Sequence, residues 1–128
     1  MRVKLRPIDL VWNRAATERG GSDPRTGDAA LAAMLRCHNA VMSGGMAFAV
    51  TDSLTPEEIA SGLAGFEYFG LIEAARVFGE ATTASDEELD QLDVAYDALV
   101  PTDQVLVRSF EGKFNAEPEQ FGPLQESA

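Results

Sequence analysis

Residue types that commonly build functional sites are scarce in this chain of 128 residues, which has one cysteine, one histidine and one tryptophan. The lone cysteine, Cys37, cannot form an internal disulfide, and we expect it to be a small core or boundary residue. His38 follows it directly, and adjacent side chains on a helix point about 100° apart, so the two cannot act together as base and nucleophile. One histidine beside one cysteine also provides too few ligands for zinc. We therefore predict no metal site, no cofactor and no enzymatic activity.

Long apolar runs are lacking as well. No stretch of about eighteen uncharged apolar residues, the length needed to cross a bilayer, occurs in the sequence. The opening Met-Arg-Val-Lys-Leu-Arg-Pro is charged and no apolar run follows it, so we expect no signal peptide. These absences predict a protein without membrane contact, with the cytoplasm as its default location.

Basic residues are also few. Ten Lys and Arg residues stand against twenty-one Asp and Glu, which gives a formal net charge of -11 and a pI of about 4.3. Residues 1–27 hold six basic and three acidic residues, whereas residues 80–128 hold two basic and twelve acidic ones. Such a balance argues against direct binding to nucleic acid and favours a basic protein as partner. The alternative is that the basic N-terminal segment folds back and neutralises part of the acidic half.

What the chain does contain is typical of one globular domain, because 45% of its residues are hydrophobic and 24% are charged. We predict an all-α fold in which six or seven helices pack around a single core. The domain divides into a basic segment with a short helix (1–27), a helical core (28–121) and a flexible tail (122–128).

Apolar residues at helical spacing place the individual helices. Thr55 with Glu58, and Ser85 with Glu88, form capping boxes, which explain the paired glutamates as first-turn carboxylates rather than as an acid and a base. Only residues 3–5 and 105–107 have a strand-like pattern, and residues 46–50 are too few to classify. The predicted helices cover residues 8–19, 28–42, 56–69, 71–81 and 86–100, with a last one from about 102 to just before Pro118.

Two glycine groups lie within structured sequence. Gly44 and Gly45 are predicted to form a turn that stops the second helix, and the functional alternative is a backbone contact with a partner or ligand. Gly62 and Gly65 are predicted to mark a close contact between helices. Neither group precedes a Lys-Ser/Thr pair, so a phosphate-binding loop is not expected.

The segment from Asp86 to Leu99 carries the most specific pattern. Leu89, Leu92, Tyr96 and Leu99 form an apolar stripe for the core. Another face carries a row of four aspartates, Asp86, Asp90, Asp93 and Asp97. The row spans roughly 16 Å, and like charges at such spacing cost a few tenths of a kcal/mol each. A solvated acidic face is one interpretation, and a surface that imitates a phosphate strand is the other. The candidate partner-binding residues are Asp86, Glu87, Asp90, Asp93, Asp97 and Asp103.

Aromatic, glycine and acidic motifs follow one another in a recognisable order. Trp12 comes early, the glycine pair is followed by Phe48, Phe69-Gly70 joins two helices, and the acidic Leu92-Asp93-Val94-Ala95-Tyr96 precedes Phe114 and Phe121. Over roughly residues 28–121 this order resembles a bacterial domain family of unknown function that includes an acidic DNA-mimic protein. The resemblance implies an all-helical fold, a possible homodimer and, for the mimic, binding of a DNA-binding regulator through an acidic surface.

The function that these patterns favour is that of a non-enzymatic, acidic protein-binding domain, with a DNA mimic as its sharpest form. An immunity or antitoxin-like protein that neutralises a basic toxin fits the same features. An enzyme with an unrecognised site is the remote alternative, and it requires a deep pocket lined by titratable groups such as His38 or Glu73.

Overall fold

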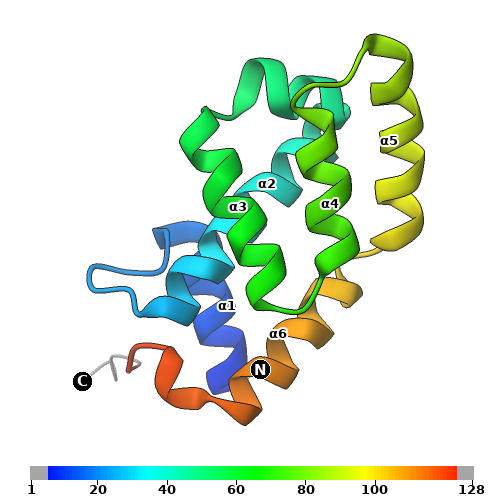
Figure 1. Cartoon of the computed structure of the whole chain (residues 1–128). Helices are drawn as coiled ribbons and strands as arrows, with labels where there is room; N and C mark the ends of the chain where they lie inside the picture. Colours follow the sequence, from blue (N-terminus) through cyan, green and yellow to red (C-terminus); the bar gives the residue numbers. More distant parts are fainter. Residues whose placement is uncertain (1–5, 124–128) are drawn as a thin grey trace, which may run out of the picture.

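The computed structural model describes residues 6–123, which contain six α-helices and two short helical turns joined by loops (Figure 1). No strand occurs in this part, which confirms the predicted all-α fold. Nor does any helix in it combine the length and apolarity that a membrane span requires. The elements are α1 (Pro7–Glu18), α2 (Thr26–Phe48), η1 (Ala49–Ser53), α3 (Pro56–Tyr68), α4 (Ile72–Ala81), α5 (Asp86–Leu99), α6 (Gln104–Ala116) and η2 (Pro118–Gln120).

The strand-like pattern at residues 105–107 is a wrong indication, because these residues form the first turns of α6. Leu106 and Phe110 lie one helical turn apart and are both buried, so helical packing decides the structure there. Residues 3–5 lie outside the described residues.

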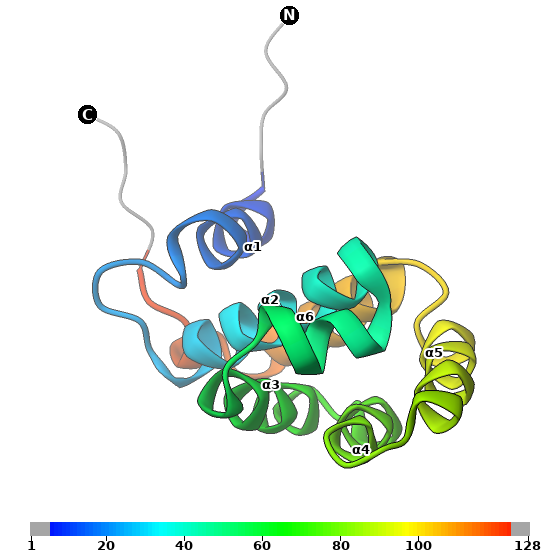
Figure 2. The same ribbon diagram turned by 90° about the horizontal axis from the view of Figure 1, so that it is seen from above.

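Helix α2 forms the centre of the fold and packs against α1, α3, α4 and α5 (Figure 2). Most of its length is buried, including the side chains of Leu31 and Met34. Its sequence is rich in alanine, and small side chains allow neighbouring helices to approach closely. A helix that is apolar on most sides is stable only when it is covered, which is why α2 lies inside.

The close contact predicted for the glycine pair of α3 is confirmed. A Cβ atom added to Gly65 would lie 2.5 Å from the carbonyl oxygen of Ala30 on α2, and one added to Gly62 would collide with the sulfur of Cys37. Cys37 is fully buried, as expected for a core residue. The two helices therefore touch nearly backbone to backbone.

Both predicted capping boxes are present. The Glu58 N–H donates to Thr55 Oγ1 at 3.1 Å, and the Thr55 N–H donates to Glu58 Oε1 at 2.9 Å. Ser85 and Glu88 exchange the same two bonds at 3.3 and 3.2 Å. Hydrogen bonds to the charged carboxylates lower the pKa of Glu58 and of Glu88. Local sequence thus sets where α3 and α5 begin.

The chain leaves helical geometry at Gly45, where φ is 85° and ψ is 178°. The glycine pair therefore kinks the helix where a stop is predicted, because helical geometry resumes at once and continues through Phe48 into η1. Residues 46–50, too few to classify from sequence, are therefore helical. The kink redirects the chain from the centre of the fold toward the start of α3.

A buried ionic cluster, here called the N-terminal corner, joins Arg14, Asp28 and Gly122. Asp28 is only 1% exposed, and Arg14 Nη2 donates to its Oδ1 at 2.7 Å. The Gly122 N–H donates to Asp28 Oδ2 at 2.6 Å, and Arg14 also donates to the Gly122 carbonyl at 3.0 Å. The flexible tail predicted from residue 122 therefore begins too early, because Gly122 is buried and hydrogen-bonded. Residues 124–128 of that tail lie outside the described residues.

Candidate functional site

Helix α5 lies at one edge of the molecule, where it contacts α4 and α2 and leaves its outer side to solvent (Figures 1 and 2). Leu89 and Tyr96 are buried as predicted, and Leu92 is half-buried. Leu99 is 37% exposed, so its predicted core position is wrong. The next residue, Val100, takes that position because the backbone turns out of the helix there, with φ of -129°.

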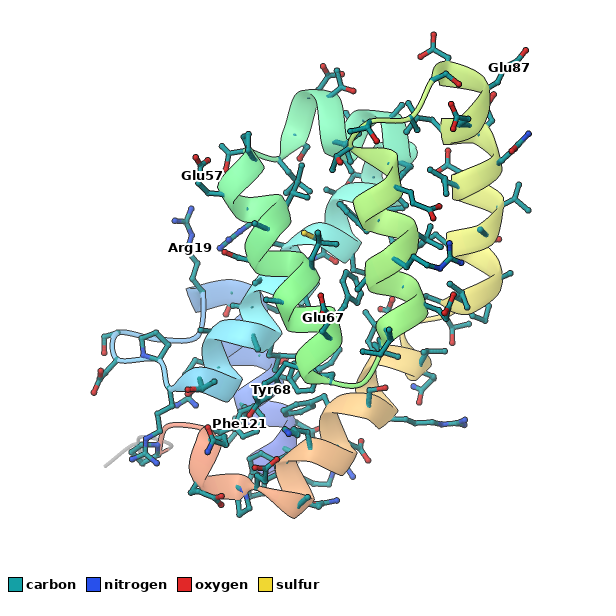
Figure 3. The ribbon with its side chains drawn as sticks, in the orientation of Figure 1. Arg19, Glu57, Glu67, Tyr68, Glu87 and Phe121 are labelled. Atoms are coloured by element: carbon teal, nitrogen blue, oxygen red, sulfur yellow. The ribbon has the colours of Figure 1, made fainter. Side chains whose placement is uncertain are left out.

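The remaining face of α5 carries carboxylates that form no ion pair within the described residues. Asp86, Glu87, Asp90 and Asp97 are exposed, and no arginine, lysine or histidine within residues 6–123 forms an ion pair with any of them. Glu87 points away from the molecule at the first turn of α5 (Figure 3). These four residues are called the α5 acidic face below. The helix therefore presents three aspartates of the predicted row, together with Glu87, to the outside.

Asp93, the remaining aspartate of the row, makes a contact within the fold. It is half-buried, and its Oδ1 accepts a hydrogen bond from the Met46 N–H at 2.7 Å. Met46 is the first residue after the kink at Gly45, so its N–H is a free donor at the start of a new helical run. A carboxylate near such an N-terminus is favoured by the exposed N–H groups and the helix dipole. Asp93 thus caps, from another helix, the turn that Gly45 opens.

Internal contacts also explain the two glycines of the candidate turn site. Gly45 has a positive φ of 85°, and a Cβ atom on it would lie 3.3 Å from Asp93 Oδ2. A Cβ atom on Gly44 would lie 2.6 Å from the ring of Phe48. A partner is therefore not needed to account for glycine at either position.

Asp103 belongs to a polar network that sequence reasoning missed. Its Oδ1 lies 2.8 Å from Nε2 of His38, and Nδ1 of His38 lies 2.8 Å from the hydroxyl of Tyr96. An ionised carboxylate only accepts hydrogen bonds, so in the neutral imidazole Nε2–H donates to Asp103 and the Tyr96 O–H donates to Nδ1. Burial raises the pKa of Tyr96, which keeps its proton in place.

This network fixes the position of Asp103 while its side chain stays 72% exposed. His38 itself is buried, and 58 and 65 positions separate it along the chain from its two partners. No spacing rule connects residues so far apart. The only sequence signal was a histidine on the most apolar helix. A buried histidine is expected to have hydrogen-bond partners, but the sequence does not predict which residues they are.

Within the described residues, Arg6, Arg14 and Arg25 of the basic N-terminal segment contact α6 and the C-terminal segment, and none of them pairs with α5. Arg14 binds the carbonyls of Gly122 and Pro123, and Arg25 binds that of Glu119. Arg6 lies 3.8 Å from Glu111 of α6. Most of these contacts are to backbone oxygens, so they neutralise little of the acidic charge. The acidic face of α5 receives none of them.

His38 and Glu73, the titratable groups named for the enzyme alternative, both take part in internal contacts. Both ring nitrogens of His38 are hydrogen-bonded, and Glu73 is exposed and paired with Arg76 at 2.8 Å. Burial raises the pKa of the Cys37 thiol to about 12, which leaves little reactive thiolate near neutral pH. Within residues 6–123, no three His, Cys, Asp or Glu side chains are grouped so as to hold a metal ion.

The fold and the site thus define a small all-α protein whose edge helix α5 exposes the four carboxylates of its acidic face, which form no ion pair with residues 6–123. No protein-family model, curated protein or solved structure matches the chain. The resemblance to the family of the acidic DNA mimic accordingly remains a prediction.

Proposed function

We propose that this protein is a non-enzymatic binding protein whose α5 acidic face occupies the basic, DNA-binding surface of another protein. One observation carries the proposal. The four exposed carboxylates of this face lie on one helix, and none of them forms an ion pair with a residue from 6 to 123. In contrast, Asp9, Asp28, Glu73, Glu80 and Glu117 are paired with arginine or lysine. Glu57 and Glu67 of α3 also lack an ion pair within the described residues, but they are ten positions apart on that helix. Unpaired like charges along a helix are unfavourable, and a partner that supplies cations removes that cost.

The geometry of the helix fits such a partner. Along α5, at about 1.5 Å rise per residue, Asp86 and Asp90 are separated by about 6 Å and Asp90 and Asp97 by about 10 Å, because Asp93 between them is turned inward. Asp103 is held in place beyond the end of the helix by His38. Proteins that bind DNA neutralise closely spaced phosphates with lysine and arginine, and the same side chains can neutralise a row of carboxylates. The proposal includes the cytoplasm as the location of the protein, which is the default expected from the sequence.

A competition experiment tests the proposal. Purified DNA-binding proteins with basic surfaces are loaded with a fluorescent DNA duplex, and this protein is titrated in at low and at physiological salt. We expect displacement of the duplex from at least one of them, weakening as salt rises. Changing Asp90→Asn together with Asp97→Asn should weaken displacement about tenfold, since each exposed ion pair contributes up to about 1 kcal/mol.

The matched control is Glu57→Gln with Glu67→Gln, which removes the same number of charges from exposed positions of α3 (Figure 3). Displacement should change little in this control if position matters and not total charge. An equal loss of displacement in the two double variants would show that displacement depends on net charge alone. No displacement at low salt, or displacement that ignores both salt and the aspartate changes, would overturn the proposed function.

A further inference from the structure

Two of the most exposed large apolar side chains lie together beside the acidic face. Met42 on α2 is 53% exposed and Val94 on α5 is 71% exposed. Both line one shallow groove between these helices, called the α2–α5 groove below. Its lining residues are Val41, Met42, Asp93, Val94, Tyr96 and Asp97.

The groove combines an apolar centre with an acidic rim. Met42 and Val94 provide the exposed apolar surface, while Asp93 and Asp97 are part of the lining. Asp90 is outside the lining and lies about one helical turn before Val94 on α5. Neither Asp90 nor Asp97 takes part in an ion pair with any residue from 6 to 123. A ligand that brings both an apolar group and positive charge would therefore satisfy the groove completely.

The walls of the groove are fixed in advance. The hydroxyl of Tyr96 is held by His38 at 2.8 Å, and the carboxylate of Asp93 is held by the Met46 N–H at 2.7 Å. A surface whose side chains are already ordered loses little conformational entropy when it binds. The network around His38, which no catalytic role requires, thus contributes to the shape of this surface.

The charge of the groove rim determines which kind of partner can bind there. A second copy of this chain would bring another α5 acidic face against the first, with like charges on both sides. A basic segment meets only opposite charge at the rim. Charge complementarity therefore favours a cationic partner over self-association at this site.

We infer that the α2–α5 groove binds an apolar side chain that a basic partner protein presents between lysine or arginine residues. Met42 and Val94 contact the apolar side chain, and Asp90 and Asp97 bind the flanking cations. This inference rests on the proposed function and refines it, since it states that the partner is recognised by an apolar anchor as well as by charge. Electrostatic attraction alone accepts any cationic surface, whereas an anchor selects among them.

Two short lysine-rich synthetic peptides that differ in one central residue, leucine or serine, provide the test. Their binding is measured by fluorescence anisotropy against the wild-type protein and the variants Met42→Ser and Val94→Ser. The matched control is Ile72→Ser, which changes a side chain 56% exposed on α4, outside the groove. All three positions are exposed, and circular dichroism verifies that each variant is folded.

We expect the leucine peptide to bind wild-type protein about tenfold more tightly than the serine peptide, as partial burial of one leucine predicts. Val94→Ser and Met42→Ser should reduce that preference to about threefold or less, and Ile72→Ser should leave it unchanged. Equal binding of the two peptides, or a preference that survives both groove variants, overturns the inference and leaves the proposed function standing. Failure of both peptides to bind at low salt counts against the proposed function itself. Self-association of the wild type that Val94→Ser abolishes would identify a second copy as the occupant and overturn the inference.

Discussion

The N-terminal corner and the α5 acidic face use the same carboxylate chemistry in opposite ways. Asp28 in the corner is buried and accepts hydrogen bonds from Arg14, from the Arg25 N–H and from the Gly122 N–H. Asp90 and Asp97 on α5 are exposed and without an ion pair to any residue in the described part of the chain. A carboxylate whose partners lie within the fold stabilises it, and one without such partners is available to another molecule. The site of function is therefore to be sought where charge is left unpaired.

The largest effect is expected in the corner. Asp28→Asn removes the charge that pairs with Arg14, whose side chain is only 16% exposed, and it replaces one strong acceptor by a donor. Breaking a buried ion pair on one side costs about 3 to 5 kcal/mol. Urea denaturation should show a loss of this size. A loss below about 1 kcal/mol would mean that the corner contributes no more than a surface ion pair.

The His38 network should rank second. His38→Leu leaves the buried hydroxyl of Tyr96 without an acceptor, at a cost of about 1 to 3 kcal/mol. Adding Tyr96→Phe in the same chain removes the orphaned group, so the double variant should be less destabilised than the sum of the two single ones. Strict additivity of the unfolding free energies would show that this hydrogen bond contributes nothing.

Asp93 lies between the two extremes, because it belongs to the acidic row but caps a helical turn. Asp93→Ala should destabilise the protein by about 1 kcal/mol, the usual cost of losing an N-cap. Asp90→Ala is the control on the same helix. Equal unfolding free energies for these two variants would remove the distinction between the structural and the free aspartates.

The smallest effect on stability is expected for the acidic face itself. Asp90→Asn with Asp97→Asn relieves like-charge repulsion, so the unfolding free energy should stay within about 0.5 kcal/mol of the wild type or rise slightly. The gain should disappear at high salt, because screening removes the repulsion in the wild type as well. A clear destabilisation would mean that these aspartates have a partner within the fold, as Asp28 does, and would contradict the comparison.

Local signals in the sequence were sufficient for most of the helices. The Thr55 and Ser85 capping boxes fixed the starts of α3 and α5, and Gly70 marks the end of α3 with a φ of 79°. Such signals act over three or four residues, so they do not depend on the rest of the fold. The row of aspartates on α5 follows for the same reason, because it is a matter of helical spacing alone.

Contacts between distant parts of the chain escaped sequence reasoning. The predicted tail included Gly122, but Asp28, 94 positions away, holds that residue in the buried corner. Leu99 was expected in the core, but Val100 occupies that position where α5 ends. Residues 105–107 had a strand-like pattern, yet they pack as helix because Leu106 and Phe110 enter the core. In each case a tertiary contact outweighs a local preference.

The sequence by itself determined that this protein is helical and acidic and that four aspartates lie along one face of a helix. Each of these is a local or additive property. Only the tertiary structure decided that Asp93 turns inward to cap Met46, while Asp90 and Asp97 are exposed and form no ion pair with residues 6–123. It also decided that Asp103 is held by His38 and that Met42 lies beside Val94. The physical reason is that pairing and exposure depend on which helices meet, and helix contacts are set by packing of the whole core and not by the spacing within one segment.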